Sequence, residues 1–338
     1  MPEAVLVTGG TGFIGGWCIV ELLKRGYRVR TTVRDLARAP AVRAAVVAAD
    51  PGDRLTIVAA DLTRDAGWDE AVAGCDHVLH VASPLGVDAP KDPNELIVPA
   101  RDGALRVLRA SVRAGVKRVV LTSSTAASTA APRAPDSVAD ETVWTDPNAP
   151  GITAYRQSKI YAERAAWEFI RTDGGATSLT TVLPGAVLGP VLSAEGLGSV
   201  QIVQRLLKGA LPGIPHFGFN VVDVRDVADL HIRAMTAPEA AGQRFIASGE
   251  YLWMADVANI LRQNLGVRAA KVPTRRLPSI LLRLASLFDK TLTQVTPMLD
   301  HRHETTSAKA QRVLGWSPRP ARETIVDCAE SLIARGAA

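Results

Sequence analysis

Tyr155 and Lys159 are side chains that can exchange protons, and they lie four residues apart in the sequence. Residues at this spacing project from the same face of a helix. A phenol with a pKa of about 10 is a weak acid at neutral pH, but an adjacent ammonium group stabilises its phenolate and lowers that pKa. The pair could therefore transfer a proton to or from a substrate. A solvated helix face is the alternative that the spacing alone leaves open.

A helix is needed to bring this pair to a site, and the sequence around it predicts one. Apolar residues recur among charged ones from Ile160 to Arg171, and Gly174 and Gly175 end the run. The preceding segment, Asp136 to Gly151, is rich in Pro, Asp and Asn and is expected to be a surface loop that leads into the helix.

The N-terminal segment predicts a dinucleotide site. The apolar run Ala4 to Val7 is typical of a strand buried on both faces, and it leads directly into a glycine-rich turn and an apolar helix. Gly9 permits the tight turn, Gly12 lets the backbone approach a pyrophosphate, and Gly15 lets the helix pack on the strand. A glycine-rich turn without a ligand is the alternative. The residues expected at the phosphates are Gly9, Thr11, Gly12, Phe13 and Ile14, because the N-terminus of the helix supplies N–H groups there.

The end of the second strand, Tyr27 to Val33, is where such folds distinguish the two nicotinamide cofactors. Arg34 follows directly, and Arg38 could join it in binding a 2′-phosphate through charge-assisted hydrogen bonds. Asp35 favours NAD instead, because an acidic side chain can bind the ribose 2′-hydroxyl of that cofactor. A further alternative is that Arg34 is a solvated loop charge. We expect NADP(H).

Further strands place more residues at the same edge. Asp61 and Leu62 follow the strand Leu55 to Ala59, where the adenine would rest, although Asp61 could instead cap the helix near Trp68. His77 and His80 lie on the next strand, on opposite faces, and are expected to be packing or hydrogen-bonding groups.

Hydroxyl groups follow the fifth strand, Arg118 to Leu121, at Thr122, Ser123 and Ser124. Open parallel sheets bind ligands beyond the carboxyl ends of their strands, so these hydroxyls are expected at the site. The two serines compete for one role, and both could instead cap the following loop. After the sixth strand, Ser178 to Leu183, the regular alternation of strand and helix ends.

The pattern predicts an α/β protein with a doubly wound parallel Rossmann sheet and a smaller, mostly helical C-terminal substrate lobe. The sheet domain is expected to comprise residues 1–184 and 221–248, and the lobe residues 185–220 and 249–338. Arg244 to Ala247 is expected to add an edge strand. Pro278 to Phe288 is amphipathic and is expected to be a core-facing helix rather than a membrane or lid helix.

Composition excludes several classes of function. The net charge is +5, but the arginines are scattered and only 5% of the residues are aromatic, which argues against nucleic acid. The 3 cysteines are dispersed without metal-ligand spacing, and His301 and His303 lack a third ligand, so no metal site is expected. The first strand leaves no room for a signal peptide and no apolar run could span a membrane, so a cytoplasmic protein is expected.

These motifs together resemble the extended short-chain dehydrogenase/reductase family over nearly the whole chain, and most closely its branch of dihydroflavonol, cinnamoyl-CoA and microbial aldehyde or ketone reductases. The resemblance is carried by the glycine turn Thr8 to Gly15, by 32–35 (TVRD), 80–84 (HVASP), 122–124 (TSS), Tyr155 with Lys159, 184–190 (PGAVLGP), 223–228 (DVRDVA) and 314–320 (LGWSPRP). Leu183 stands where the family usually has Asn before the proline.

The resemblance implies that Ser124, Tyr155 and Lys159 are catalytic and that Lys159 also holds the nicotinamide ribose. It further implies that Pro184 and Val187 line the nicotinamide and that Val81, Ala82 and Ser83 lie on the ribose side. The activity it implies is NADPH-dependent reduction of a carbonyl compound, with Tyr155 as proton donor. An NAD-dependent epimerase or dehydratase of a sugar-type substrate and a non-catalytic dinucleotide sensor are the alternatives.

The substrate is expected to be a neutral, largely apolar aldehyde or ketone, because phosphorylated carriers require cationic side chains. From Gly185 to Gln204 the one charged residue is Glu195, and Leu211 to Phe219 is also largely apolar. Arg205 and Lys208 are exceptions that could turn toward a carrier. The natural substrate, the stereochemistry and the oligomeric state, monomer or homodimer, stay open.

Overall fold

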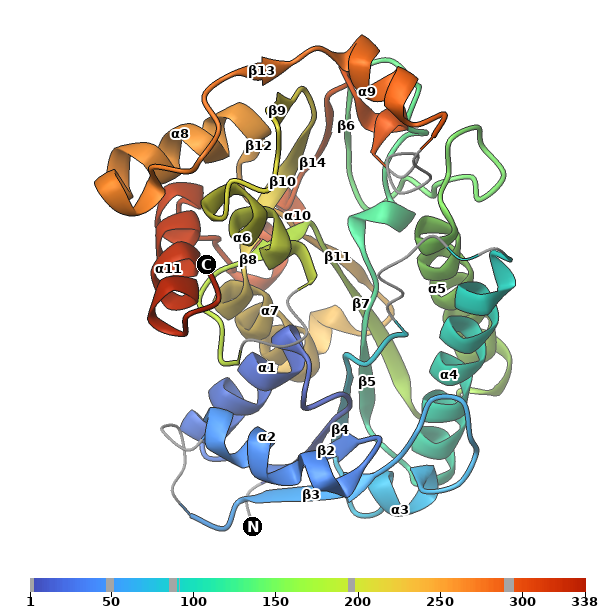
Figure 1. The fold of residues 1–338 in the computed structure, drawn as a ribbon. Helices are drawn as coiled ribbons and strands as arrows, with labels where there is room; N and C mark the ends of the chain where they lie inside the picture. Colours follow the sequence, from blue (N-terminus) through green and yellow to red (C-terminus); the bar gives the residue numbers. More distant parts are fainter. Residues whose placement is uncertain (1–2, 47–51, 85–89, 91, 194–197, 289–294) are drawn as a thin grey trace.

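The central element of the structure, a computed structural model, is a parallel sheet (Figure 1). The structure describes residues 3–46, 52–84, 90, 92–193, 198–288 and 295–338. Within these ranges the sheet has seven strands, in the spatial order β11 (Arg244–Ala247), β7 (Ser178–Pro184), β5 (Arg118–Thr122), β4 (His77–His80), β1 (Ala4–Val7), β2 (Arg28–Val33) and β3 (Leu55–Ala59). Each neighbouring pair is parallel, and β11 is the expected edge strand.

Helices cover both faces of this sheet, which is why its strands are nearly continuous apolar runs. One face carries α1 (Phe13–Lys24), α2 (Ala39–Val46) and α7 (Val224–Thr236), and the other carries α3 (Trp68–Val72), α4 (Asn94–Arg113) and α5 (Ala154–Asp173). The direction of winding reverses between β1 and β4, and such a switch point is where open sheets bind ligands. The predicted doubly wound Rossmann sheet is confirmed.

A second group of elements forms the helical lobe. Helices α6 (Gln201–Leu207), α8 (Met254–Leu265) and α11 (Ala321–Ala334) share a buried apolar cluster with a small sheet of β12 (Tyr251–Trp253), β10 (Gly218–Asp223) and β8 (Ala186–Leu188). The predicted boundaries of the two domains stay a prediction. Helix α10 (Ala308–Leu314) and the buried Trp316 pack in the core cluster of the large sheet rather than in that of the lobe.

The prediction of a loop from Asp136 to Gly151 was wrong near its start. The segment contains β6 (Ser137–Ala139), which pairs in parallel with β14 (His303–Thr305). The two segments are far apart in the sequence, so neither one's local composition reveals the partner that makes it a strand.

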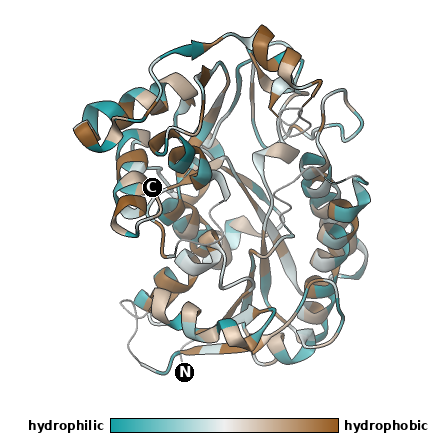
Figure 2. Cartoon of the chain, in the orientation of Figure 1, coloured by the Kyte–Doolittle hydropathy of each residue, from teal (hydrophilic) through white to brown (hydrophobic). Residues whose placement is uncertain are grey.

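The expectation of a core-facing helix near Pro278 was also wrong. Helix α9 (Ser279–Ala285) contains no buried residue, and Figure 2 shows hydrophobic residues on it at the top of the molecule. Ile280 is 60% exposed, and Leu287 and Phe288 just beyond the helix are 75% and 91% exposed. The apolar residues of this segment border a cavity instead of a packed core, as described below.

Composition predicts neither a metal site nor a membrane-spanning segment. Across the described ranges, no group of three or more potential ligands could hold a metal ion, and no helix has the length and apolar character to span a membrane. Cys18, Cys75 and Cys328 are all buried and unpaired.

Candidate active site

The tyrosine of the predicted pair lies at the start of α5. The hydroxyl of Thr153 caps the helix by accepting a hydrogen bond from the backbone N–H of Arg156 at 3.3 Å, which places Tyr155 in the first turn. The hydroxyl of Ser124 lies near the phenol of Tyr155. Burial raises the pKa of Tyr155 and the nearby Ser124 hydroxyl lowers it in part, so the net depression expected from Lys159 is not found. The phenol is therefore protonated at neutral pH, the form that a proton donor needs.

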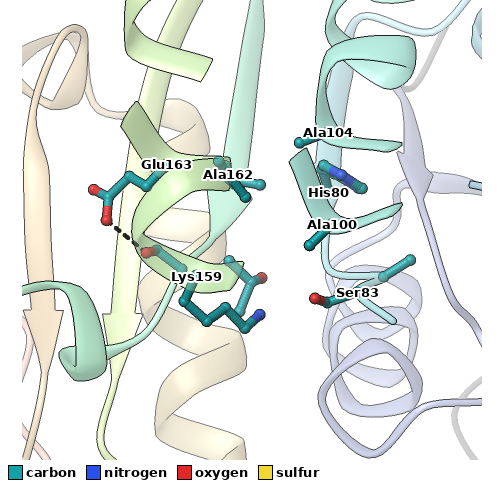
Figure 3. A pocket seen from close by; sticks show the side chains of 11 residues that line it. His80, Ser83, Ala100, Ala104, Lys159, Ala162 and Glu163 are labelled. Atoms are coloured by element: carbon teal, nitrogen blue, oxygen red, sulfur yellow. Dashed lines mark hydrogen bonds between the residues drawn. The ribbon is translucent and has the colours of Figure 1, made fainter. Parts of the chain in front are cut away.

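The structure separates the roles of the two competing serines. Ser123 is buried and donates its hydroxyl hydrogen to the Glu163 carboxylate at 2.6 Å, an interaction drawn as a dashed line in Figure 3. Ser124 is more exposed; its hydroxyl accepts from the backbone N–H of Ala126 at 3.2 Å and contacts Tyr155. Ser124 is thus the serine that lies near the phenol, whereas the hydroxyl of Ser123 is hydrogen-bonded in the interior.

Lys159 lies one turn after Tyr155 on α5 and is buried. Its side chain extends into a small cavity of about 20 Å³, with His80 and Ser83 on the opposite wall (Figure 3). Burial lowers the pKa of Lys159 to about 8, and the charge of Glu163 opposes that effect. The amine is therefore mostly protonated at neutral pH and close to its titration point.

The glycine-rich turn has the geometry that the motif predicts. Gly9 has a φ of +76°, and the N–H of Gly12 donates to the Gly9 carbonyl at 2.9 Å, so the chain reverses tightly before α1. A Cβ on Gly15 would lie 2.4 Å from the same carbonyl, which excludes any side chain there. Thr11 is exposed at the tip, and Phe13 and Ile14 are half-buried in the first turn of the helix. The first N–H groups of α1 therefore face open space, as a phosphate site requires.

Thr8 connects this turn to the end of β4. Its hydroxyl oxygen accepts from the N–H groups of Val81 and Ala82 at 3.1 and 3.0 Å, and it lies 2.8 Å from Nδ1 of His80. A hydroxyl that accepts twice has one hydrogen to donate, so His80 accepts at Nδ1 and carries its proton on Nε2. Burial lowers the pKa of His80 to about 3 and keeps the ring neutral. The expected hydrogen-bonding role of His80 is confirmed.

The residues expected to choose the cofactor lie at the end of β2. Arg34 is exposed, and its charge helps to lower the pKa of Asp61, so the two side chains are near each other. Asp35, the residue that argued for NAD, accepts a hydrogen bond from the backbone N–H of Ala37 at 2.9 Å and caps a short turn. Arg38, in that turn, is also exposed.

Asp61 does not cap the helix near Trp68. Its carboxylate accepts from the backbone N–H and the hydroxyl of Thr63, both at 2.9 Å, and the residue before α3 is Gly67. Leu62 packs closely on Gly103 of α4. Both residues therefore shape the end of β3, and contact with an adenine stays a prediction.

The remaining expected cofactor residues differ in exposure. Val81, Ala82 and Ser83 are half-exposed where β4 ends beside the glycine turn, and an added Cβ on Gly9 would lie 3.0 Å from the Ala82 side chain. Pro184 and Val187 are buried at the point where the chain leaves the large sheet. Their contact with a nicotinamide stays a prediction and could involve only a small part of each side chain.

The sequence reasoning missed a buried charged pair beside this site. The guanidinium Nε of Arg244 donates to the Glu163 carboxylate at 2.8 Å, and both side chains are buried. The signal was present, because Glu163 follows Lys159 by four residues and so continues the helix face of Tyr155 and Lys159. Its partner lies on the edge strand and could not be identified from local sequence.

A larger cavity lies in the helical lobe. Its volume is about 450 Å³, within the roughly 300–1,000 Å³ typical of small-ligand pockets. Its described lining is Ile202, Arg205, Leu211, Pro212, Gly213, Pro215, Phe217, Met254, Leu277, Leu281, Leu282, Ala285, Val295, Thr296 and Leu299. Arg205 is the one charged residue in this lining, and it is exposed.

The cavity adjoins the segment that leads into α5. Thr296 and Leu299 form part of its wall, and Pro297 between them would lie 3.1 Å from a Cβ added to Gly151, four residues before Tyr155. Of the expected apolar segment Gly185 to Gln204, Ile202 lines the cavity, whereas Val191, Val200 and Val203 are buried in the core of the lobe. Glu195 lies outside the described residues. Further apolar lining comes from residues 211–217, within the expected segment Leu211 to Phe219, and from α9.

The glycine turn and the reversal of strand order together define a dinucleotide-binding α/β protein. The chain belongs to the NAD dependent epimerase/dehydratase family, whose sequence profile matches residues 5–247. The resemblance to extended short-chain dehydrogenases/reductases is thereby confirmed.

Individual relatives span most or all of the chain. Cinnamoyl-CoA reductase CAD2 of Medicago truncatula is 38% identical over 269 residues, which are 78% of this chain and 81% of that protein. Ketoreductase azaE of Aspergillus niger is 32% identical over 354 residues, and the match covers 98% of each chain. The structure of yeast methylglyoxal/isovaleraldehyde reductase Gre2 complexed with NADPH matches with a TM-score of 0.82 and 28% identity, over 99% of this chain and 100% of Gre2.

Proposed function

We propose that this protein is an NADPH-dependent reductase that converts neutral, largely apolar aldehydes or ketones to alcohols. The observation that carries the proposal is the position of Ser124, just beyond the carboxyl end of β5, near the protonated Tyr155. Relatives that are reductases, and the NADPH complex of the similar Gre2, support the reaction class and the cofactor.

The residues at the glycine turn fit NADPH. Gly12 lets the backbone approach a pyrophosphate, Gly15 lets α1 pack against the turn, and Arg34 presents a cation where a 2′-phosphate would lie. Because the Asp35 carboxylate accepts a backbone hydrogen bond in its own turn, it is less suited to compete for the ribose. When bound, NADPH supplies the hydride for the carbonyl carbon.

In the proposed mechanism, Ser124 donates a hydrogen bond to the substrate's carbonyl oxygen. Tyr155 transfers its phenolic proton to the same oxygen as negative charge develops there. Lys159, positively charged beside the phenol, stabilises the phenolate that remains and holds the ribose hydroxyls of the cofactor. A protonated Tyr155 suits reduction, and the pKa raised by burial keeps it protonated.

The apolar cavity supports the choice of substrate. A bound apolar group gains about 25 cal/mol per Å² of surface removed from water, whereas a carrier phosphate placed there would meet a single guanidinium, that of Arg205. The experiment compares kcat/KM for a branched alkyl or aryl aldehyde with that for an aromatic acyl-CoA, with NADPH oxidation as the signal. Preference for the thioester would contradict the proposed substrate class, and product formed without net NADPH oxidation would favour an epimerase or dehydratase.

A further inference from the structure

Glu163 lies one turn beyond Lys159 on α5, and its side chain is completely inaccessible to solvent. Its carboxylate oxygens accept five hydrogen bonds from four side chains, three of them on neighbouring elements and one, Trp167, on α5 itself. The donors are Ser123 at 2.6 Å, Thr181 at 2.8 Å, Nε and Nη2 of Arg244 at 2.8 and 3.4 Å, and Nε1 of Trp167 at 3.3 Å. A buried carboxylate that accepts this many hydrogen bonds is rigidly held.

The network ties α5 to the carboxyl half of the sheet. Thr181 lies on β7, Arg244 on the edge strand β11, and Ser123 directly follows β5. Arg244 also donates to the carbonyls of Glu141 and Val143, in the segment that follows β6, at 2.7 and 3.0 Å. The carboxylate therefore joins the helix that carries the proton donor to the strand end that carries the reactive serine.

Stability does not explain why a charged pair occupies this position. Two buried charges lose their hydration, and a well-packed apolar pair of similar volume is often as stable or more so. The charge of Glu163 is better explained by its effect on neighbouring residues, and both Ser123 and Lys159 are near its carboxylate. Ser123 is covalently joined to Ser124, so its position fixes that of the serine that contacts Tyr155.

Few described groups other than Glu163 can stabilise the positive charge of Lys159. Within the described chain its ammonium group has no hydrogen bond or ion pair, and the cavity it enters also has Glu163 in its wall. From β4 it faces His80, which is neutral, and from α4 it faces Ala100 and Ala104, while Tyr155 on its own helix is protonated. Arg244 from β11 is bound to Glu163 itself. Among the described residues, Glu163 is thus the one carboxylate whose charge opposes the effect of burial on the Lys159 ammonium group.

We propose that Glu163 is a positioning residue for this site. It fixes Ser123, and with it Ser124, against Tyr155, and it supplies the negative charge that keeps Lys159 protonated. The inference rests on the proposed roles of Tyr155 and Lys159.

The test uses Glu163→Gln in the full-length enzyme, with Glu168→Gln as the matched control. Glu168 is on the same helix but exposed and paired with Arg171, at 2.6 Å. We expect Glu163→Gln to move the basic limb of the kcat profile to lower pH by about one unit, the low end of the shift that a nearby opposite charge produces. NADPH binding, measured by cofactor fluorescence without substrate, should weaken over the same lower pH range. Glu168→Gln should change neither profile.

Glu163→Gln leaves the Arg244 guanidinium without its counter-charge, so this variant could unfold. The double variant Glu163→Gln with Arg244→Met removes both charges and keeps an unbranched, apolar side chain at position 244, and it should show the same shift of both profiles. A folded double variant whose two pH profiles coincide with those of the native enzyme would overturn the inference, even if its turnover or thermal stability were reduced. If Tyr155→Phe and Lys159→Ala retained turnover, the proposed function itself would be wrong. Loss of turnover in those two variants together with unmoved Glu163 profiles would reject only the role of Glu163.

Discussion

Apolar residues are placed differently around the glycine turn and on α9. Helix α1, which follows the glycine turn, buries residues such as Ile19 and Leu22 completely. Helix α9 buries none of its residues, and its leucines border a cavity or solvent. A fixed backbone geometry suits one cofactor, whereas a cavity lined by aliphatic side chains can accept substrates of several shapes. We therefore propose that the glycine-turn region recognises the cofactor and that the cavity beside α9 sets the range of substrates.

Tyr155→Phe tests whether the proton donor comes from the sheet domain, which also carries the glycine turn. The substitution removes the proton donor but keeps the ring and its packing, so turnover should fall at least ~100-fold, the lower end of general acid contributions. NADPH affinity should change little, because the hydroxyl is the only group lost. Steady-state kinetics and cofactor titration measure the two effects, and near-normal turnover would remove Tyr155 from the mechanism.

Arg34→Ala examines the specificity of the cofactor half. A charge-assisted hydrogen bond contributes about 1.5 to 3 kcal/mol, so NADPH should bind roughly 10- to 150-fold more weakly while NADH is nearly unaffected. Dissociation constants for both cofactors measure this difference. Equal weakening of both would mean that Arg34 only supports the loop.

Leu282→Ala tests whether the cavity in the lobe binds the substrate. Leu282 lines the cavity, and its shortening removes apolar contact with a bound substrate, so kcat/KM for an apolar aldehyde should fall about tenfold. NADPH affinity should stay unchanged. Leu287→Ala is the matched control, since Leu287 is exposed and outside the cavity lining. Equal effects of the two substitutions would mean that this cavity does not hold the substrate.

Stability measurements provide the smallest expected effect. Leu287→Ala should alter the free energy of unfolding by no more than about 0.5 kcal/mol, as is usual for surface substitutions. Ile19→Ala, in the core beside the glycine turn, should cost about 2 to 5 kcal/mol. Urea denaturation of both variants measures the contrast. A large loss for Leu287→Ala would show that the segment after α9 is packed in solution.

Local sequence was sufficient where a residue's environment depends on its own neighbours. The glycine turn after β1 and the shared face of Tyr155 and Lys159 follow from short-range spacing, and the structure has both. Ser123 and Ser124 could not be separated from the residues alone, because only the direction of each hydroxyl distinguishes them. The predicted pKa of Tyr155 failed because burial, a property of the whole fold, outweighs the neighbouring charge.

Long-range pairing accounts for the other errors. Arg244 on β11 binds Glu163 on α5, which is 81 residues away in the sequence, and β6 pairs with β14 from the C-terminal part of the chain. The hydrophobic pattern of α9 was read correctly as amphipathic, but it could not indicate that a cavity rather than a core lies on its apolar side. A sequence pattern gives the polarity of a face and leaves open what that face meets.

The pairing of β6 with β14 also has a mechanical consequence. Backbone hydrogen bonds join residues 137–139, in the segment before the proton-donor helix, to residues 303–305 of the C-terminal part. Thr305 is further held by the side-chain carbonyl oxygen of Asn220, which accepts from its backbone N–H at 2.9 Å. If the lobe rotated to close over a substrate, this strand pair would act as a tether and transmit the motion to the segment leading to Tyr155. Such a closure would link substrate capture to the alignment of Tyr155 through the backbone.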